Sequence, residues 1–238
     1  KLRAFIENDF IEEKTYRVKA GQEKKIRWEK DFKDIIPWSP KNPKLYLLKF
    51  QLFYDDKSID DLIERVGFRT VEVNNDKIKI NGESIFLKGF NRHEDYGEIG
   101  CAIPLQNMVQ DLDLMQDMGA NALRTSHYPN DERFLDLCDE RGILVWEENH
   151  ARGLSLENMQ NPNFEKQCED CIEEMITYHY NHPSIIIWGI LNECASDTEE
   201  GRIMYQKQYE QIRRMDSSRP TTSATCKHFT DICLDLPD

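Results

Sequence analysis

The stretch from residue 185 to 193 reads IIIWGILNE, in which an apolar run ends on the amide of Asn192 and the carboxylic acid of Glu193. The run is short and β-branched at its start, so we expect a buried strand rather than a helix. In parallel α/β sheets and barrels, the carboxyl ends of the strands are where chemistry is usually placed. Asn192 and Glu193 are therefore the first candidates for a functional site.

Polar residues also gather at the ends of three other predicted strands. A single such cluster is weak evidence of function, because surface loops are generally polar. Four clusters at the same end of one sheet favour a binding or catalytic site. Two nearby tryptophans, Trp146 and Trp188, are either core residues or an aromatic floor beneath a sugar ring. The clusters comprise Asn91, Arg92, His93, Glu94 and Asp95 after the first strand, Arg124 and His127 at the second, Glu147, Glu148, Asn149 and His150 after the third, and Asn192 and Glu193 after the fourth.

The composition of these clusters limits the chemistry. Carboxylates dominate, and the sequence has no Gly-rich phosphate loop and no nucleophile elbow with Ser or Cys. Cys168 and Cys171 have a redox-like spacing, but both thiols are expected on the apolar face of a helix, which favours core packing. His179 and His182 could suit a metal by spacing. With no third ligand nearby, they are more consistent with helix-end histidines that interact with the helix dipole.

Short strands are predicted to form the first part of the chain. Up to about residue 73 the apolar residues recur with period two, in YRVKA, KKIRW, LYLLKFQLFY and VGFRTVEV. Strands of this length and spacing predict an antiparallel β-sandwich. Asn81-Gly82, between two apolar runs, predicts a hairpin that leads into a second domain.

After residue 85, short strands alternate with amphipathic helices. Four helices, including one over 164–178 and one capped at Asp197 and ending near Met215, separate the predicted strands. This alternation predicts a parallel βα array. A closed (β/α)₈ barrel needs roughly 250 residues and only about 155 are left, so we expect the barrel to stop at its fifth strand or just beyond. The predicted strands are SIFLKGF, NALRTSH, GILVWEEN, IIIWGILNE and PTTSATC.

Composition excludes several classes of partner. The formal net charge of −13 over 238 residues leaves no basic stripe for a nucleic acid or an anionic bilayer. No apolar run is long enough to span a membrane, and seven scattered cysteines fit a reduced, cytoplasmic protein. The chain opens at Lys1 and stops at Asp238 without a closing element, so we expect it to be part of a longer protein, with any leader outside it.

Two long stretches, NALRTSHYPNDERFLDLCDERGILVWEE and NHPSIIIWGILNE, closely resemble the signatures of glycoside hydrolase family 2, the β-galactosidase and β-glucuronidase family. LKGFNRHED, PWSPKNPKLY and VGFRTVEV extend the resemblance over nearly the whole chain. It implies a multidomain β and α/β protein. An immunoglobulin-like β-sandwich over 1–75, partial at its N-terminus, would precede the N-terminal part of a catalytic TIM (β/α)₈ barrel over 76–238, about strands 1–5.

The resemblance also implies roles for individual residues. Glu193 resembles the general acid/base at the end of the fourth barrel strand, and Asn192 its neighbour that hydrogen-bonds the sugar 2-hydroxyl. Arg124 is similar to an arginine that orients the nucleophilic carboxylate, and Glu148 matches a strand-end acid of less defined role. With the histidines that look like sugar contacts, the substrate-binding candidates are Asn192, His127, His93, Arg124 and Glu148.

The implied reaction is that of a retaining exo-β-glycosidase, which uses two carboxyl groups about 5–5.5 Å apart in a double displacement. The acid must keep its proton near neutral pH, and we expect the apolar residues 185–188 to raise its pKa. The family nucleophile is a glutamate on the seventh strand, expected beyond Asp238, and the strand order excludes Glu147 and Glu148 from that role. The fragment alone is therefore expected to be inactive.

Other aspects of function stay open. EENHARGL does not match the acid-and-histidine pattern of magnesium-binding β-galactosidases, so no metal or other cofactor is predicted. RHED leans towards a β-glucuronide and HYPN towards a β-galactoside as the carbohydrate substrate. A homo-oligomeric full-length protein is compatible with the sequence. The alternatives are a non-catalytic carbohydrate-binding or structural fragment, and a metal-dependent hydrolase using His150, His179 and His182.

Overall fold

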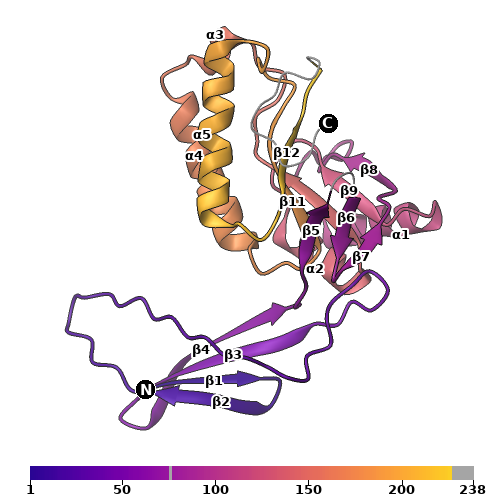
Figure 1. Cartoon of the computed structure of the whole chain (residues 1–238). Coiled ribbons are helices and arrows are strands. Elements are labelled where there is room, and N and C mark those ends of the chain that lie inside the picture. The colour runs from indigo at the N-terminus through magenta and orange to yellow at the C-terminus, as the bar shows by residue number, and fades with distance from the viewer. Residues whose placement is uncertain (75–76, 227–238) are drawn as a thin grey trace.

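The computed structural model describes residues 1–74 and 77–226 (Figure 1). These residues form three sheets: an antiparallel sheet of order β2-β1-β3-β4, a small sheet of order β5-β6-β7, and a parallel sheet of order β12-β11-β10-β9-β8. The first sheet lies at one end of the molecule, and the helices lie around the parallel sheet at the other (Figure 1). None of the helices in the described ranges combines the length and the apolar character needed to cross a bilayer.

The N-terminal sheet contains fewer strands than the period-two pattern predicts. Residues 15–38 contain no strand, so the predictions for YRVKA and KKIRW are wrong. Basic and acidic residues fill the alternate positions there, and Val18 and Ile26 are exposed, so this segment has too little apolar surface to form a second buried layer. The observed strands are β1 (Leu2–Ile6), β2 (Asp9–Lys14), β3 (Tyr46–Tyr54) and β4 (Lys57–Val66).

The predicted hairpin at Asn81-Gly82 is confirmed. Both residues have positive φ, 52° and 80°, as a two-residue type I′ turn requires, and they join β6 (Lys77–Ile80) to β7 (Glu83–Ile85). β5 (Val71–Asn74) completes the small sheet by pairing with β6. The predicted domain boundary at 75/76 falls between these two strands, and it stays a prediction. SIFLKGF is not one strand, because β7 ends at Ile85 and the next strand begins at Gly89.

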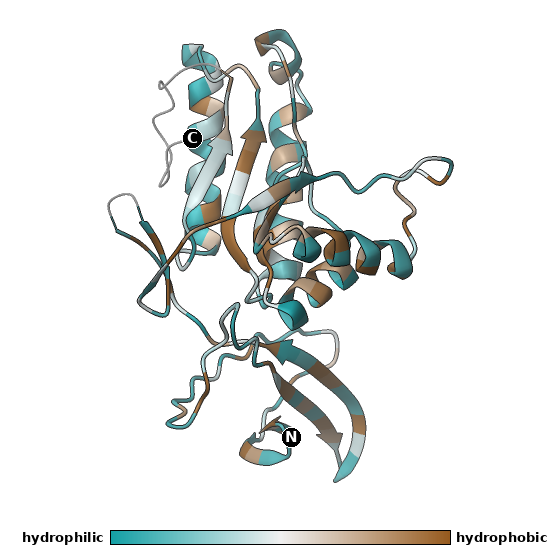
Figure 2. Ribbon diagram, turned by 90° about the vertical axis from the view of Figure 1, so that its right-hand side faces the viewer, coloured by the Kyte–Doolittle hydropathy of each residue, from teal (hydrophilic) through white to brown (hydrophobic). Residues whose placement is uncertain are grey.

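The parallel βα array predicted from the sequence is confirmed. Five strands lie side by side in chain order, with helices between them that cover one face of the sheet (Figure 1). Hydrophobic and hydrophilic residues alternate along the helices, as amphipathic helices require (Figure 2). The elements are β8 (Gly89–Arg92), α1 (Leu105–Asp117), β9 (Ala122–Thr125), α2 (Glu132–Arg141), β10 (Leu144–Glu148), α3 (Leu156–Met159), α4 (Phe164–His179), β11 (Ile185–Asn192), α5 (Glu199–Met215) and β12 (Thr221–Ala224).

The start of α5 differs from the prediction by one residue. Its N-cap is Thr198, whose Oγ1 accepts a hydrogen bond of 3.0 Å from the backbone N–H of Gly201, so Asp197 is not the cap. The same Oγ1 donates to the carbonyl of Ala195 at 2.9 Å. This second bond holds the hydroxyl in place and accounts for the choice of cap.

β11 forms the centre of the apolar core. All eight of its residues are buried, as expected for a strand covered on both faces. Trp188 lies in the core on the helix side, with its indole N–H donating to Asp216 Oδ2 at 2.8 Å. Ile186 and Ile187 lie in a second cluster with Trp38. Trp188 is therefore a core residue and not a floor for a sugar.

The N-terminal part is joined to the α/β part through the PWSP loop. Trp38 is fully buried and its indole N–H donates to the carbonyl of Asp139 at 2.9 Å. Gly142 has φ +69°, and a Cβ there would lie 2.4 Å from the carbonyl oxygen of Pro40. The loop thus packs against the turn after α2, where only glycine leaves enough room.

The Gly142 contact can be tested with a matched pair of variants. Gly142→Ala and Gly119→Ala both place a side chain at positive φ, at a backbone cost of about 1–2 kcal/mol each, but a Cβ at Gly119 meets nothing within 4 Å. We expect Gly142→Ala to lower the free energy of unfolding by roughly 1–3 kcal/mol more than Gly119→Ala, measured by urea denaturation. Equal losses would show that the Pro40 contact is readily displaced.

Candidate active site

Arg124 joins three strand ends of the parallel sheet. Its Nε donates to Glu148 Oε2 at 2.9 Å, and its Nη2 donates to Asn192 Oδ1 at 2.7 Å. The guanidinium lies 4.6 Å from the centre of the Trp146 ring. Side chains from β9, β10 and β11 thus converge at the carboxyl edge of the sheet, where the sequence predicted a site.

Glu148 holds the centre of this cluster. Its side chain has no solvent exposure, and Oε1 lies 2.7 Å from Nδ1 of His127. Burial raises the pKa of the Glu148 carboxyl, and Arg124 and His127 act against that rise. Both carboxylate oxygens are therefore bonded within the protein, so the geometry favours a positioning role. The predicted contact of Glu148 with substrate stays a prediction.

His93 and Glu193 complete the predicted set. His93 is exposed, and its ring meets that of His127 edge to face at 5.3 Å and 81°. Glu193 follows β11 with φ 51°, and its backbone N–H donates to the carbonyl of Ala224 at 2.8 Å. Its side chain is exposed at the same edge, beside Asn192.

The expectation that residues 185–188 surround Glu193 is wrong. These residues are buried at the opposite end of β11, and a strand rises about 3.3 Å per residue, which places Trp188 roughly 16 Å away along the strand. Because a strand is extended, residues that precede Glu193 by several positions lie far from it in space. The exposed Glu193 carboxyl has no apolar setting from its own strand.

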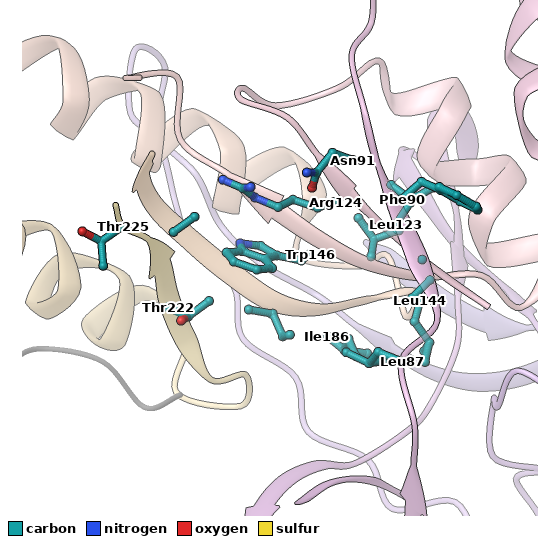
Figure 3. A pocket seen from close by; sticks show the side chains of 15 residues that line it. Leu87, Phe90, Asn91, Leu123, Arg124, Leu144, Trp146, Ile186, Thr222 and Thr225 are labelled. Carbon is teal, nitrogen blue, oxygen red and sulfur yellow. The ribbon is translucent and has the colours of Figure 1, made fainter. Parts of the chain in front are cut away.

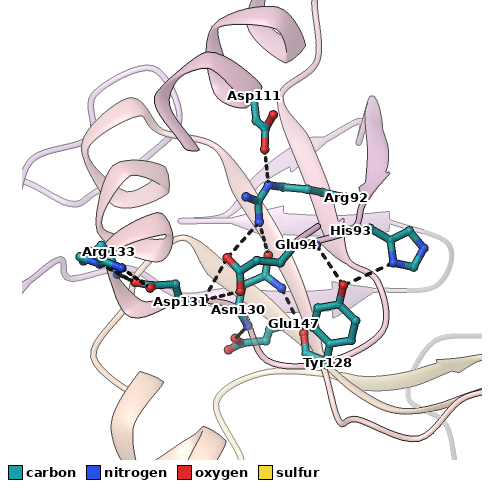
Figure 4. A network of polar contacts seen from close by, with 9 residues as sticks. All are labelled: Arg92, His93, Glu94, Asp111, Tyr128, Asn130, Asp131, Arg133 and Glu147. Carbon is teal, nitrogen blue, oxygen red and sulfur yellow. Dashed lines mark hydrogen bonds and ion pairs between the residues drawn. The ribbon is translucent and has the colours of Figure 1, made fainter. Parts of the chain in front are cut away.

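A buried polar network joins β8, α1 and β10 (Figure 4). Arg92, only 4% exposed, donates from Nε to Asp111 at 2.9 Å and from Nη1 to Asn130 Oδ1 at 2.6 Å. The backbone N–H of Asn130 donates to Glu147 Oε1 at 3.2 Å, and Glu147 Oε2 lies 2.9 Å from His179 Nδ1. Glu147 is fully buried, so it belongs to this network and not to a surface that binds substrate.

The helix-end histidines have partners that the sequence did not reveal. His179 lies in the last turn of α4, and both His179 and His182 also contact a buried carboxylate. Among the described residues, the side chains with metal-like spacing include His182 but neither His150 nor His179, so the arrangement gives no support to the metal-dependent hydrolase. The Nδ1 atoms of His150, His179 and His182 contact Asn149 Oδ1 at 3.0 Å, Glu147 Oε2 at 2.9 Å and Asp139 Oδ2 at 2.6 Å, respectively.

One group of side chains has a metal-like spacing. Ligand atoms of Asp136, Asp139 and His182 lie within 4.8 Å of one another. Protein groups already occupy them: Asp139 accepts from the N–H of Ser184 at 3.0 Å, and Asp136 pairs with Arg65 at 2.7 Å. The group lies at the amino end of β11, away from the candidate site. The prediction that no metal is needed stays a prediction.

The Cys168 and Cys171 pair lacks the features of a redox site. Burial raises the pKa of the Cys168 thiol to about 12 and that of Cys171 to about 11. Reactive cysteines have lowered pKa values. Cys168 is buried in the core as predicted, whereas Cys171 is only half-buried.

A cavity of about 450 Å³ opens on the inner face of the parallel sheet (Figure 3). Leu87, Leu144 and Ile186 line its apolar part, and Arg124 and Trp146 line its polar part. A Cβ at position 189 would lie 2.5 Å from Trp146 Nε1, so the glycine there makes room for the indole. Trp146 is half-buried and faces the cavity, so it remains a candidate for the aromatic side chain that stacks against a sugar ring.

Comparison with known proteins identifies the family. The model of the glycosyl hydrolases family 2 TIM barrel domain matches residues 71–237, and that of glycosyl hydrolases family 2 matches residues 5–69. The chain belongs to glycoside hydrolase family 2. The family indicates an immunoglobulin-like domain followed by a TIM-barrel domain, of which the described residues form five parallel strands.

Several members are similar in structure or sequence. The crystal structure of a family 2 β-galacturonidase from Eisenbergiella tayi is 52% identical with a TM-score of 0.91, and the match covers 98% of this chain and 41% of that one. A β-galactosidase from Bifidobacterium adolescentis is 33% identical over 84% of this chain, and a putative β-glucuronidase from Formosa agariphila is 34% identical over 77%. The chain spans 20% and 23% of these two relatives.

The buried pair of His179 and Glu147 predicts a pH effect on stability. Burial acts to lower the pKa of His179, but the nearby carboxylates of Glu147, Glu132 and Asp131 together outweigh it, so the pKa is raised. A raised histidine pKa gives stability that is complete below the unfolded value of about 6.5 and is lost as pH rises through the folded value. We therefore expect the free energy of unfolding to fall as pH rises from about 6.5, and to fall less in His179→Gln.

His150→Gln is the control for this effect. Burial lowers the pKa of His150, so its contribution to the pH dependence lies below about pH 6.5. Chemical denaturation at several pH values between about 6 and 9 measures both variants. A fall that persists in His179→Gln and disappears in His150→Gln would contradict the assignment.

Proposed function

We propose that the complete protein is a retaining exo-β-glycosidase in which Glu193 is the general acid/base. The observation that carries this is the Arg124 cluster: one guanidinium bonded to both Glu148 and Asn192, at the strand edge where Glu193 is exposed. Family membership supports the activity class. A non-catalytic carbohydrate-binding protein is the alternative, and an exposed strand-end acid beside a fixed amide favours the enzyme.

In the proposed reaction, Glu193 gives its proton to the glycosidic oxygen while a second carboxylate attacks the anomeric carbon. The leaving alcohol departs, and Glu193 then removes a proton from the water that hydrolyses the glycosyl-enzyme. Glu147 and Glu148 are buried and bonded within the protein, so we assign the nucleophile to a residue outside the described ranges.

Asn192 has the geometry of a sugar ligand. Its Oδ1 accepts from Arg124 at 2.7 Å, which fixes the amide orientation and leaves the Nδ2 hydrogens as donors. A donor beside the acid/base is suited to the sugar 2-hydroxyl, whose hydrogen bond strengthens in the transition state. Arg124 thus acts by holding both Asn192 and Glu148.

The proposed substrate is a β-linked uronide, with galacturonide as the first candidate. The Eisenbergiella tayi β-galacturonidase bound to galacturonate is 53% identical over 98% of this chain. Arg152 is exposed near the cluster, its guanidinium 5.7 Å from the Tyr128 ring, and it pairs with no carboxylate among residues 1–74 and 77–226. Its loop is bonded to Asn192 through Ala151 and Gly153, so its position is fixed relative to the proposed sugar site. A guanidinium of this kind is suited to the substrate carboxylate.

The acid/base role predicts a dependence on leaving group. In the complete enzyme, Glu193→Ala should slow cleavage of poor leaving groups, which need protonation, by about 10² to 10⁴-fold, and that of activated aryl glycosides far less. The glycosyl-enzyme should accumulate with the activated substrate, and azide should restore turnover with a β-glycosyl azide as product. Equal losses for all leaving groups without azide rescue would make Glu193 a structural carboxylate.

The uronide proposal is tested with Arg152→Gln in the complete enzyme. Charged hydrogen bonds contribute about 1.5–3 kcal/mol, so kcat/KM for an aryl β-galacturonide should fall roughly 10- to 100-fold. The value of kcat/KM for an aryl β-galactoside, which has no carboxylate, should change little. Arg133→Gln, which removes an exposed arginine paired with Asp131, is the control for charge. Equal losses on both substrates would reject Arg152 as the carboxylate ligand.

A further inference from the structure

Tyr128 contacts a candidate sugar ligand, His93, through its hydroxyl group. Its hydroxyl oxygen accepts a hydrogen bond of 3.0 Å from the backbone N–H of Glu94 and lies 3.4 Å from Nδ1 of His93 (Figure 4). The two rings are 6.2 Å apart and tilted by 51°. Tyr128 therefore lies between a fixed backbone donor and an exposed imidazole.

The hydrogen-bonding capacity of these groups fixes the direction of the bond from Glu94. A backbone N–H can only donate, so the Tyr128 oxygen is the acceptor from Glu94. The single hydroxyl hydrogen then remains to be donated, and Nδ1 of His93, 3.4 Å away, is positioned to accept it. When Tyr128 donates in this way, the neutral His93 ring carries its proton on Nε2, the other ring nitrogen.

The backbone around His93 is held rigidly enough to maintain this arrangement. Arg92 and Glu94, on either side of His93, are 4% and 9% exposed. Arg92 is bonded to Asp111 and Asn130, and the Glu94 carboxylate accepts from the N–H of Asp131 at 3.1 Å. His93 is the exposed residue between two anchored ones.

His127 has the opposite arrangement. Its Nδ1 lies 2.7 Å from Glu148 Oε1, which as an ionised carboxylate oxygen can only accept, and 3.2 Å from Nη2 of Arg124, which can only donate. The shorter contact with the carboxylate favours a proton on Nδ1 of the neutral ring. Nε2 of His127 then carries a lone pair. The His93 and His127 rings are 5.3 Å apart, edge to face.

We propose that Tyr128 is a positioning residue that fixes the His93 tautomer, so that the two imidazoles offer a sugar one donor, Nε2–H of His93, and one acceptor, Nε2 of His127. A hydroxyl group both donates and accepts and can use the two together, whereas a carboxylate can only accept. This pair therefore selects a hydroxyl-bearing part of the sugar. The assignment of a sugar to this edge rests on the proposed function.

The tautomers can be observed directly in the chain itself. Long-range ¹H–¹⁵N correlation spectra of ¹⁵N-histidine-labelled protein at about pH 8, where ordinary imidazoles are neutral, distinguish a proton on Nδ1 from one on Nε2. We expect Nε2–H for His93 and Nδ1–H for His127. The same tautomer on both rings would overturn the proposal, and this result needs no variant.

Two variants separate the causes. Tyr128→Phe should make the Nδ1–H form of His93 detectable and leave His127 unchanged, and Glu148→Ala, which removes the acceptor, should release His127 and leave His93 unchanged. Tyr178→Phe, at a tyrosine that is 70% exposed, is the matched control and should change neither ring. An unchanged His93 spectrum in folded Tyr128→Phe would reject the role of Tyr128. Opposite tautomers in a complete protein that hydrolyses no glycoside would instead reject the proposed function alone.

Discussion

The arrangement of the site depends on the buried ion pair between Arg124 and Glu148. Glu148 is completely removed from water, and an isolated buried carboxylate is strongly unfavourable. Arg124 and His127 provide its compensation, and Arg124 also binds Asn192. Because these side chains come from β9, β10 and β11, the pair fixes the relative positions of three strand ends. Removing one partner of such a pair typically lowers the free energy of unfolding by about 3–5 kcal/mol. A change in the site residues therefore also affects the stability of the sheet.

The two ends of the parallel sheet carry different kinds of interaction. At the amino end, apolar residues of β11 pack with Trp38 and the small sheet, which anchors the N-terminal part. At the carboxyl edge, polar side chains are bonded in two networks, one containing Arg92 and Glu147 and the other containing Arg124 and Glu148. His93 and Glu193, which are exposed, face solvent at this edge.

The sequence predicted the elements better than the partners. The apolar run before Asn192, the Asn81-Gly82 turn and the alternation of strands and helices depend on local patterns, and all three are observed. The period-two pattern wrongly predicted strands over residues 15–38. Such a pattern does not show whether a second layer of apolar residues is present for the strands to pack against. The partners of His179, His182 and Tyr128 lie 32, 43 and 34 residues away, so no local pattern contains them.

Three glutamates at this edge share a residue type and differ in environment. Glu147 and Glu148 lie inside β10, where the strand directs them into polar networks, whereas Glu193 lies one residue beyond β11. Its φ of 51° is costly for a non-glycine residue, by about 1–3 kcal/mol, and persists only where the surroundings impose it. The bond from its N–H to Ala224 of β12 is such a restraint. The direction of the proposed acid/base is therefore set by the next strand, and not by the apolar run that precedes it.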